Sequence, residues 1–117
     1  MSSGTLAEVL AVGGWAHVEL GLAGVTDKPG FMERCVRAFE LPGYFGRNWD
    51  ALADCLADLS WAPPARGRLV EVTGWQEYAE AEPDDWRIAR EVFAEAADHW
   101  RGSGSELRIV LALGGSS

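Results

Sequence analysis

Three aspartates at successive spacings of four, Asp50, Asp54 and Asp58, form the pattern in this sequence that is best suited to chemistry. Four residues are close to one helical turn, so the three carboxylates lie on one side of a helix. A charged helix face is usually only the solvated one. Here, however, no Lys or Arg stands four residues further on to neutralise any of the three, and Asp is a poor helix former in mid-helix. The pattern favours a negative stripe kept for binding, with a solvated face as the alternative.

Motifs for catalysis or metal binding are weak by comparison. His17 and His99 lie far apart in the sequence, without a Cys or acidic residue at metal-ligand spacing, which favours structural or solvated roles. No serine lies in a Gly-x-Ser-x-Gly elbow, and the glycine pairs match neither a phosphate loop nor a dinucleotide fingerprint. Cys55 falls on the apolar side of its helix, as an inert core thiol does. We therefore expect no enzymatic activity, no cofactor and no metal site.

The stripe needs a helix to position it, and the residues around it predict one. A loop rich in Pro and Gly spans residues 41–46, and Asn48 can cap a helix that runs to about residue 60. Tyr44 in this loop and Glu95 on a later helix border the stripe if the two helices pack side by side. The side opposite the aspartates is apolar and carries Trp49, Leu52, Ala53, Cys55, Leu56 and Leu59.

Six tryptophans are many for 117 residues. Trp49, Trp86 and Trp100 follow the spacing of a helical core, which favours packing. Trp61 falls just past the acidic helix, where packing and exposure at a contact surface are equally open.

Strand and helix alternate along the rest of the chain. Residues 16–25 predict a strand, and Asp27 caps a helix that has Pro29 in its first turn and ends before Pro42. The further expected elements are a strand at residues 69–73, about one helical turn around Trp75 and Tyr78, a helix capped by Asp84 or Asp85 that buries Trp86, Ala89, Phe93, Ala96, Ala97 and Trp100, and a strand at residues 107–113. That last strand is nearly continuous in apolar residues, which predicts that it is covered on both faces or lies at the sheet centre. Strands separated by helices predict an α/β fold with a small parallel sheet.

Size, charge and cysteine content exclude several classes of protein. The length suits one domain, expected at residues 15–114, with residues 1–14 as a frayed tail. The net charge of −8 disfavours direct binding of nucleic acid and favours a basic partner. Two cysteines do not suggest a disulfide framework, and neither a secretory signal nor a run of membrane-spanning length is evident. We expect a cytoplasmic protein that does not bind membranes.

Residues 41–56 read Leu-Pro-Gly-Tyr-Phe-Gly-Arg-Asn-Trp-Asp-Ala-Leu-Ala-Asp-Cys-Leu, which resembles the signature of the barstar family nearly position for position. Weaker similarity extends over residues 18–113, including residues 92–96 and the closing apolar strand. Barstars are intracellular inhibitors of secreted bacterial ribonucleases. The resemblance implies a three-stranded parallel sheet covered by helices, and a bacterial inhibitor, monomeric alone, that binds a guanyl-specific microbial ribonuclease one to one.

The resemblance also implies which residues bind that partner. In the family, an acidic helix and the loop before it plug the ribonuclease active site, and carboxylates occupy places where RNA phosphates would lie. Tyr44, Asn48, Asp50, Asp54 and Glu95 match contact positions of the family, and Asp54 matches the central anchor. The expected partner-binding surface further includes Trp49, Ala53, Asp58 and Trp61. Ala53 stands where the best-known member has a tryptophan, so one aromatic contact is missing, and Trp61 is the candidate to replace it.

Two other functions remain open from the sequence. Asp50, Asp54 and Glu95 could hold Mg²⁺ for phosphoryl transfer, since hard cations take carboxylates, although no phosphate cradle accompanies them. The same fold could also serve an immunity or regulatory protein whose partner is not a ribonuclease.

Overall fold

The computed structural model describes residues 13–58 and 65–112, and the structure below is that of these residues. The elements follow in the order β1 (Trp15–Gly21), α2 (Lys28–Phe39), α3 (Trp49–Asp58), β2 (Gly67–Thr73), α4 (Trp75–Ala81), α5 (Pro83–Trp100) and β3 (Glu106–Leu111). The strands form one parallel sheet in the order β1-β2-β3, which confirms the predicted α/β fold with a three-stranded parallel sheet covered by helices. Trp61, Leu59 and the expected tail up to residue 12 lie outside the described residues.

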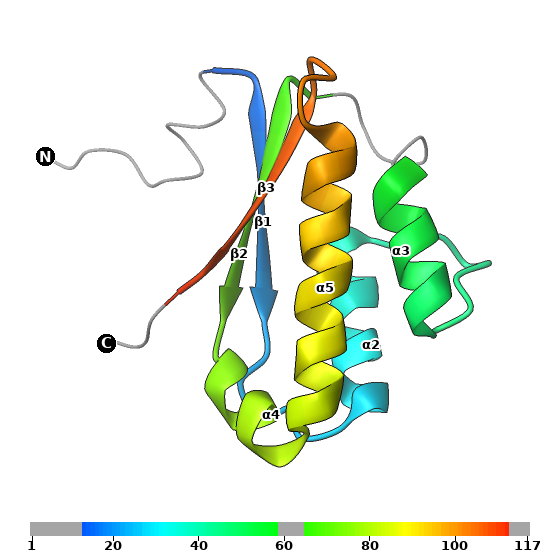
Figure 1. Ribbon diagram of the computed structural model, residues 1–117, viewed down its shortest axis with the longest axis vertical. Helices are drawn as coiled ribbons and strands as arrows, with labels where there is room; N and C mark the ends of the chain where they lie inside the picture. Colours follow the sequence, from blue (N-terminus) through cyan, green and yellow to red (C-terminus); the bar gives the residue numbers. More distant parts are fainter. Residues whose placement is uncertain (1–12, 59–64, 113–117) are drawn as a thin grey trace, which may run out of the picture.

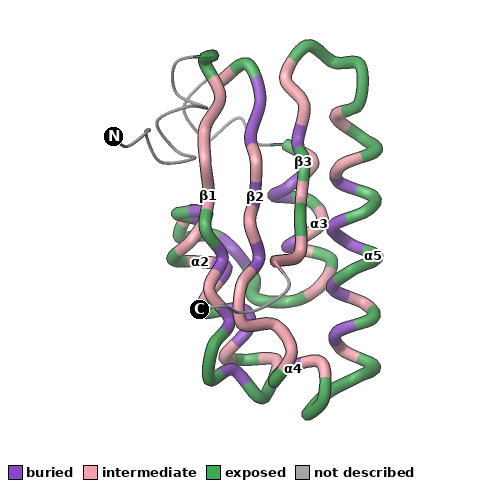
Figure 2. Tube along the Cα trace, turned by 90° about the vertical axis from the view of Figure 1, so that its left-hand side faces the viewer, coloured by how far each residue is buried: buried purple, intermediate pink, exposed green. Residues whose placement is uncertain are grey.

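Helices cover one face of the sheet. Leu20 of β1 pairs with Val72 of β2, and both side chains are fully buried on the side of α2 and α5. These two helices pack on the edge strands, α2 on β1 and α5 on β3 (Figure 1). The opposite face carries His17, Glu71 and Arg108, and Figure 2 shows the three strands side by side with no helix in front of them. Because side chains alternate along a strand, each strand sends every second residue into this single core.

The prediction that the last strand is covered on both faces or lies at the sheet centre is wrong. β3 pairs only with β2 among the described strands, so it is an edge strand. Leu107 is buried on the helix side, whereas Arg108 and Val110 are exposed on the helix-free face. An apolar run in the sequence does not distinguish an apolar side chain that faces a helix from one, such as Val110, that faces water.

The core is organised around the ring of Phe31 in α2, which is fully buried. It contacts one aromatic ring from each of the other three helices: Trp49 of α3 at 5.4 Å between centroids, Tyr78 of α4 at 5.3 Å and Phe93 of α5 at 6.2 Å. Aromatic pairs at such separations stabilise beyond the area that they bury. The Phe31 cluster therefore joins the four helices that the described residues form.

Two of the predicted helix starts had different outcomes. The side chain of Asp27 accepts a hydrogen bond of 2.8 Å from Gly30 N, which confirms it as the cap of α2, and Pro29 lies in the first turn. The prediction that Asp84 or Asp85 caps the last long helix is wrong. That helix, α5, begins at Pro83, and its N-cap residue makes no side-chain capping bond. Proline suits the first helical position, and the two aspartates lie in the first turn, where negative charge interacts favourably with the helix dipole.

α3 is the outermost element of the fold. It packs against α5, and Trp49 at its start contacts α2, on the side of these helices away from the sheet (Figure 1). One side of α3 therefore faces the core, and no described element covers the other. None of the helices described is both long and apolar enough to cross a bilayer.

Candidate functional site

The three aspartates of α3 lie on its uncovered side. Asp50, Asp54 and Asp58 are exposed, whereas Leu52, Cys55 and Leu56 are buried, so the helix has the two sides that the spacing predicts. Neither Asp50 nor Asp54 makes an ion pair with any residue that the structure describes, and Asp58 has an interaction within the chain. We call these three residues the acidic face of α3.

Asn48 caps the helix that carries the acidic face. Its Oδ1 accepts a hydrogen bond of 2.7 Å from Ala51 N, and its Nδ2 donates one of 3.3 Å to Gly46 O. Both ends of the amide are thus used inside the protein. Asp50 lies in the first turn, where its carboxylate interacts favourably with the helix dipole.

The loop before α3 is held so that one aromatic ring faces solvent. Leu41 and Phe45 are buried, and Phe45 N donates to Pro42 O at 3.0 Å to close a turn. Tyr44, between them, is 74% exposed. Arg47 has a positive φ of 56° and forms an ion pair through its Nη1 with Glu33 of α2. Tyr44 therefore faces solvent in the loop that leads into the helix of the acidic face.

Trp49 and Ala53 are placed differently from the aspartates. Trp49 is half-buried, contacts Phe31, and has the Lys28 ammonium 5.8 Å from its ring centre. Its ring lies mostly with the packing residues, and its part in a contact surface stays a prediction. Ala53 is half-buried and packs against the core, next to the exposed Asp54.

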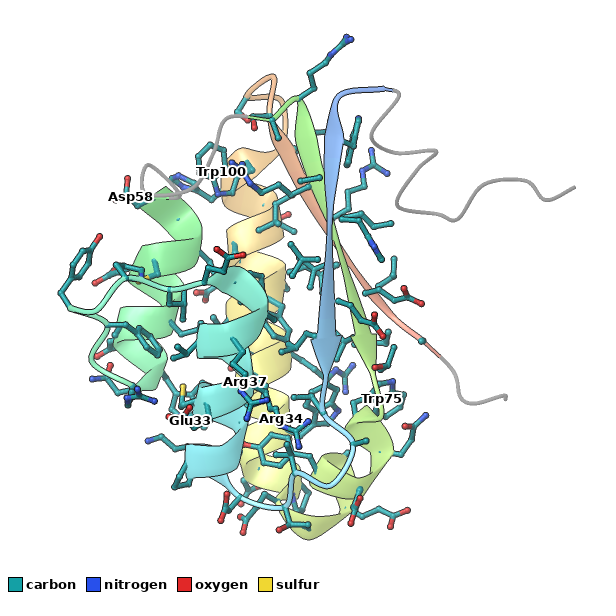
Figure 3. All side chains as sticks on the ribbon, turned by 180° about the vertical axis from the view of Figure 1, so that it is seen from behind. Glu33, Arg34, Arg37, Asp58, Trp75 and Trp100 are labelled. Carbon is teal, nitrogen blue, oxygen red and sulfur yellow. The ribbon has the colours of Figure 1, made fainter. Side chains whose placement is uncertain are left out.

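Glu95 lies on α5, the helix against which α3 packs, and it is exposed. The two helices run in the same direction, with their C-terminal ends together near the labelled Asp58 and Trp100 (Figure 3). There the indole Nε1 of Trp100 donates a hydrogen bond of 2.7 Å to Leu56 O. Trp100 follows Glu95 by five residues, and Leu56 likewise follows Ala51 by five residues. At 1.5 Å of rise per residue, Glu95 is therefore roughly level with the first turns of α3.

The other candidates for chemistry in the described residues include the two cysteines and His17. Burial, reinforced by the charges of Asp54 and Asp58, raises the pKa of the Cys55 thiol, and burial alone raises that of Cys35. Both thiols are therefore protonated, and neither is activated as a nucleophile. His17 lies 3.3 Å from a carboxylate oxygen of Glu71 on the sheet. Within residues 13–58 and 65–112, no three His, Cys, Asp or Glu side chains are grouped so that they could hold a metal ion.

Sequence reasoning assigned Trp100 to packing and gave no role to Arg47, yet both hold the parts of this surface in place. No local signal marks either contact, because Trp100 and Leu56 are 44 positions apart and the Arg47 partner lies 14 positions upstream. The periodicity of one helix carries no information about such pairs.

Together, these observations define a small α/β protein with an exposed acidic face on its outermost helix and an exposed Tyr44 in the loop that leads into it. The family model described as Barstar (barnase inhibitor) matches residues 15–112, and the chain belongs to this family. A search of curated proteins found no match.

Proposed function

We propose that this protein inhibits a secreted, guanyl-specific bacterial ribonuclease by placing the acidic face of α3 and Tyr44 in its active site. It does so as a monomer, one to one, in the cytoplasm of the producing cell. Membership of the barstar family supports the class of partner. The observation that carries the proposal is that Asp50 and Asp54 stand exposed on the outermost helix without an ion pair to any described residue.

The chemistry of the partner explains why carboxylates suit this role. A site that cleaves RNA needs Arg, Lys or His to hold a phosphate and to stabilise the charge of its transition state. Carboxylates accept charge-assisted and often bidentate hydrogen bonds from such groups. A helix is a rigid support, so these anions meet the site with little entropy to lose on binding. Ala53 and Ala57 flank Asp54 with small side chains, which lets the partner approach the helix closely.

The charge of the whole protein acts before contact. A net charge of −8 attracts a basic nuclease and accelerates encounter, and salt screens this attraction over about 10 Å at 0.1 M. The association rate is therefore expected to fall steeply as salt is added. The dissociation rate, which depends on short-range contacts, changes less.

Substitution of the central anchor tests the proposal. Asp54→Ala is compared with Asp84→Ala, which removes an equal charge from another exposed helix position, roughly 16 Å along α5 from Glu95. Truncating one member of a desolvated charge pair costs about 3–5 kcal/mol, so Asp54→Ala is expected to weaken inhibition about 10²- to 10⁴-fold. Asp84→Ala should change it only through steering, by about two-fold.

The readout is RNA cleavage by guanyl-specific microbial ribonucleases titrated with each variant. Inhibition that survives Asp54→Ala would remove the anchor assignment. If the wild-type protein inhibits no such enzyme, the ribonuclease proposal itself is wrong, and a protein partner of another kind becomes the better explanation. The Mg²⁺ alternative has no group of three ligands behind it in the part of the chain that the structure describes.

A further inference from the structure

The acidic face and Glu95 belong to different helices, and one hydrogen bond ties those helices together at their C-terminal ends. Trp100 Nε1 donates to Leu56 O at 2.7 Å, from the last residue of α5 to the last turn of α3. Trp100 is half-buried, and its ring meets that of His99 edge-on at 5.3 Å. The indole is thus held by its neighbours and reaches across to α3.

The position of the acceptor gives this bond its significance. Leu56 lies between Asp54 and Asp58, so Trp100 is hydrogen-bonded to the segment of the helix that carries the acidic face. Glu95 precedes Trp100 by five residues, or about 7.5 Å of helix. A slide or rotation of α3 along α5 would move Asp54 relative to Glu95 and would break the bond.

We propose that Trp100 is a positioning residue, which fixes the acidic face of α3 relative to Glu95 so that both reach a ribonuclease in one preformed arrangement. This inference rests on the proposed function. Preformed binding groups lose less entropy on association, so the effect of Trp100 is on the lifetime of the complex. Trp100 itself does not touch the partner in this scheme.

The chain offers a matched control. Trp75 makes the same kind of bond, from its Nε1 to Ala112 O at 2.8 Å, and it is also half-buried. It lies at the opposite end of the molecule from Trp100 (Figure 3). Trp100→Phe and Trp75→Phe each remove one indole-to-carbonyl bond and keep an aromatic ring. Both are therefore expected to lower the urea midpoint of unfolding by similar amounts.

The two variants are expected to differ in their rates of binding to the ribonuclease. Trp100→Phe is expected to raise the dissociation rate from the inhibited ribonuclease about two- to ten-fold, the range that one net hydrogen bond supports, at an unchanged association rate. Trp75→Phe should leave both rates as in the wild type. Glu95→Ala should also cost less in the Trp100→Phe background than in the wild type, because the two helices are no longer held in register. Equal dissociation rates for Trp100→Phe and Trp75→Phe would overturn the proposal.

Amide hydrogen exchange tests the structural part without a partner. Exchange in residues 52–58 should accelerate in Trp100→Phe and not in Trp75→Phe. Unchanged exchange there would overturn the positioning role, even if the protein inhibits a ribonuclease. Conversely, faster exchange in a protein that binds no ribonuclease would leave Trp100 as the tie between the helices and remove the proposed function.

Discussion

Substitution of Asn48 separates two roles that the sequence assigns to one residue. Asn48 matches a contact position of the barstar family, and it also caps α3 through the 2.7 Å bond from Ala51 N to its Oδ1. Its Nδ2 donates to Gly46 O at 3.3 Å, so the amide has few hydrogen-bonding positions left for a partner. We expect Asn48 to act on inhibition mainly through the helix that it caps.

Asn48→Ala and Asn48→Asp differ in the hydrogen bonds that they keep. Asn48→Ala removes the acceptor, and loss of a cap costs about 0.5–2 kcal/mol. Asn48→Asp keeps an acceptor for Ala51 N and adds a charge that the helix dipole stabilises by about 0.3–1 kcal/mol at low salt. The Asp variant loses only the weaker 3.3 Å bond to Gly46 O. The expected free energy of unfolding is therefore about 1 kcal/mol lower for the Ala variant and close to the wild-type value for the Asp variant.

We expect inhibition to weaken only as far as the loss of the Asn48 cap destabilises α3. A loss of about 1 kcal/mol corresponds to about a five-fold change in an equilibrium constant, so the Ala variant should inhibit at most about five-fold more weakly. The Asp variant should inhibit as well as the wild type. Stability is measured by urea unfolding and inhibition by titration of a ribonuclease. An Asp variant that is as stable as the wild type but inhibits as poorly as the Ala variant would refute this reasoning, because the amide would then contact the partner directly.

Two further predictions concern the core. Tyr78 is fully buried, and its hydroxyl has no hydrogen-bond partner among the described residues, so Tyr78→Phe should keep the stack on Phe31 and raise the free energy of unfolding by about 1 kcal/mol. A loss of similar size in urea unfolding would mean that the hydroxyl is in fact satisfied. Burial raises the pKa of the Cys35 thiol, so the folded protein keeps this proton while the unfolded chain releases it above about pH 8.5. The stability linked to Cys35 is therefore complete below that pH and falls above it by about 1.4 kcal/mol per pH unit. Cys35→Ala should make the decline of the free energy of unfolding between pH 9 and 10.5 shallower, by about the contribution of one titrating group. Identical slopes for the wild type and the variant would contradict the assignment.

The helices and strands of this protein could largely be predicted because each is encoded by neighbouring residues. The spacing of Asp50, Asp54 and Asp58 placed them on one side of α3, and the side chain of Asp27 marked the start of α2. Boundaries were less certain: the first strand ends at Gly21 instead of residue 25, and α4 has seven residues instead of about one turn. At the start of α5, Pro83 outweighed the capping signal of the two aspartates after it.

The sequence by itself determined the order of the elements, the acidic face and the family, because residues within a few positions of each other carry that information. Tertiary structure alone decided that β3 is an edge strand, that α3 is the outermost helix and that Tyr44 stands exposed between buried neighbours. It also decided the bond from Trp100 to Leu56 and the ion pair between Arg47 and Glu33. These features depend on which surfaces meet when the helices pack. Two residues far apart in the chain share no periodicity from which their contact could be predicted.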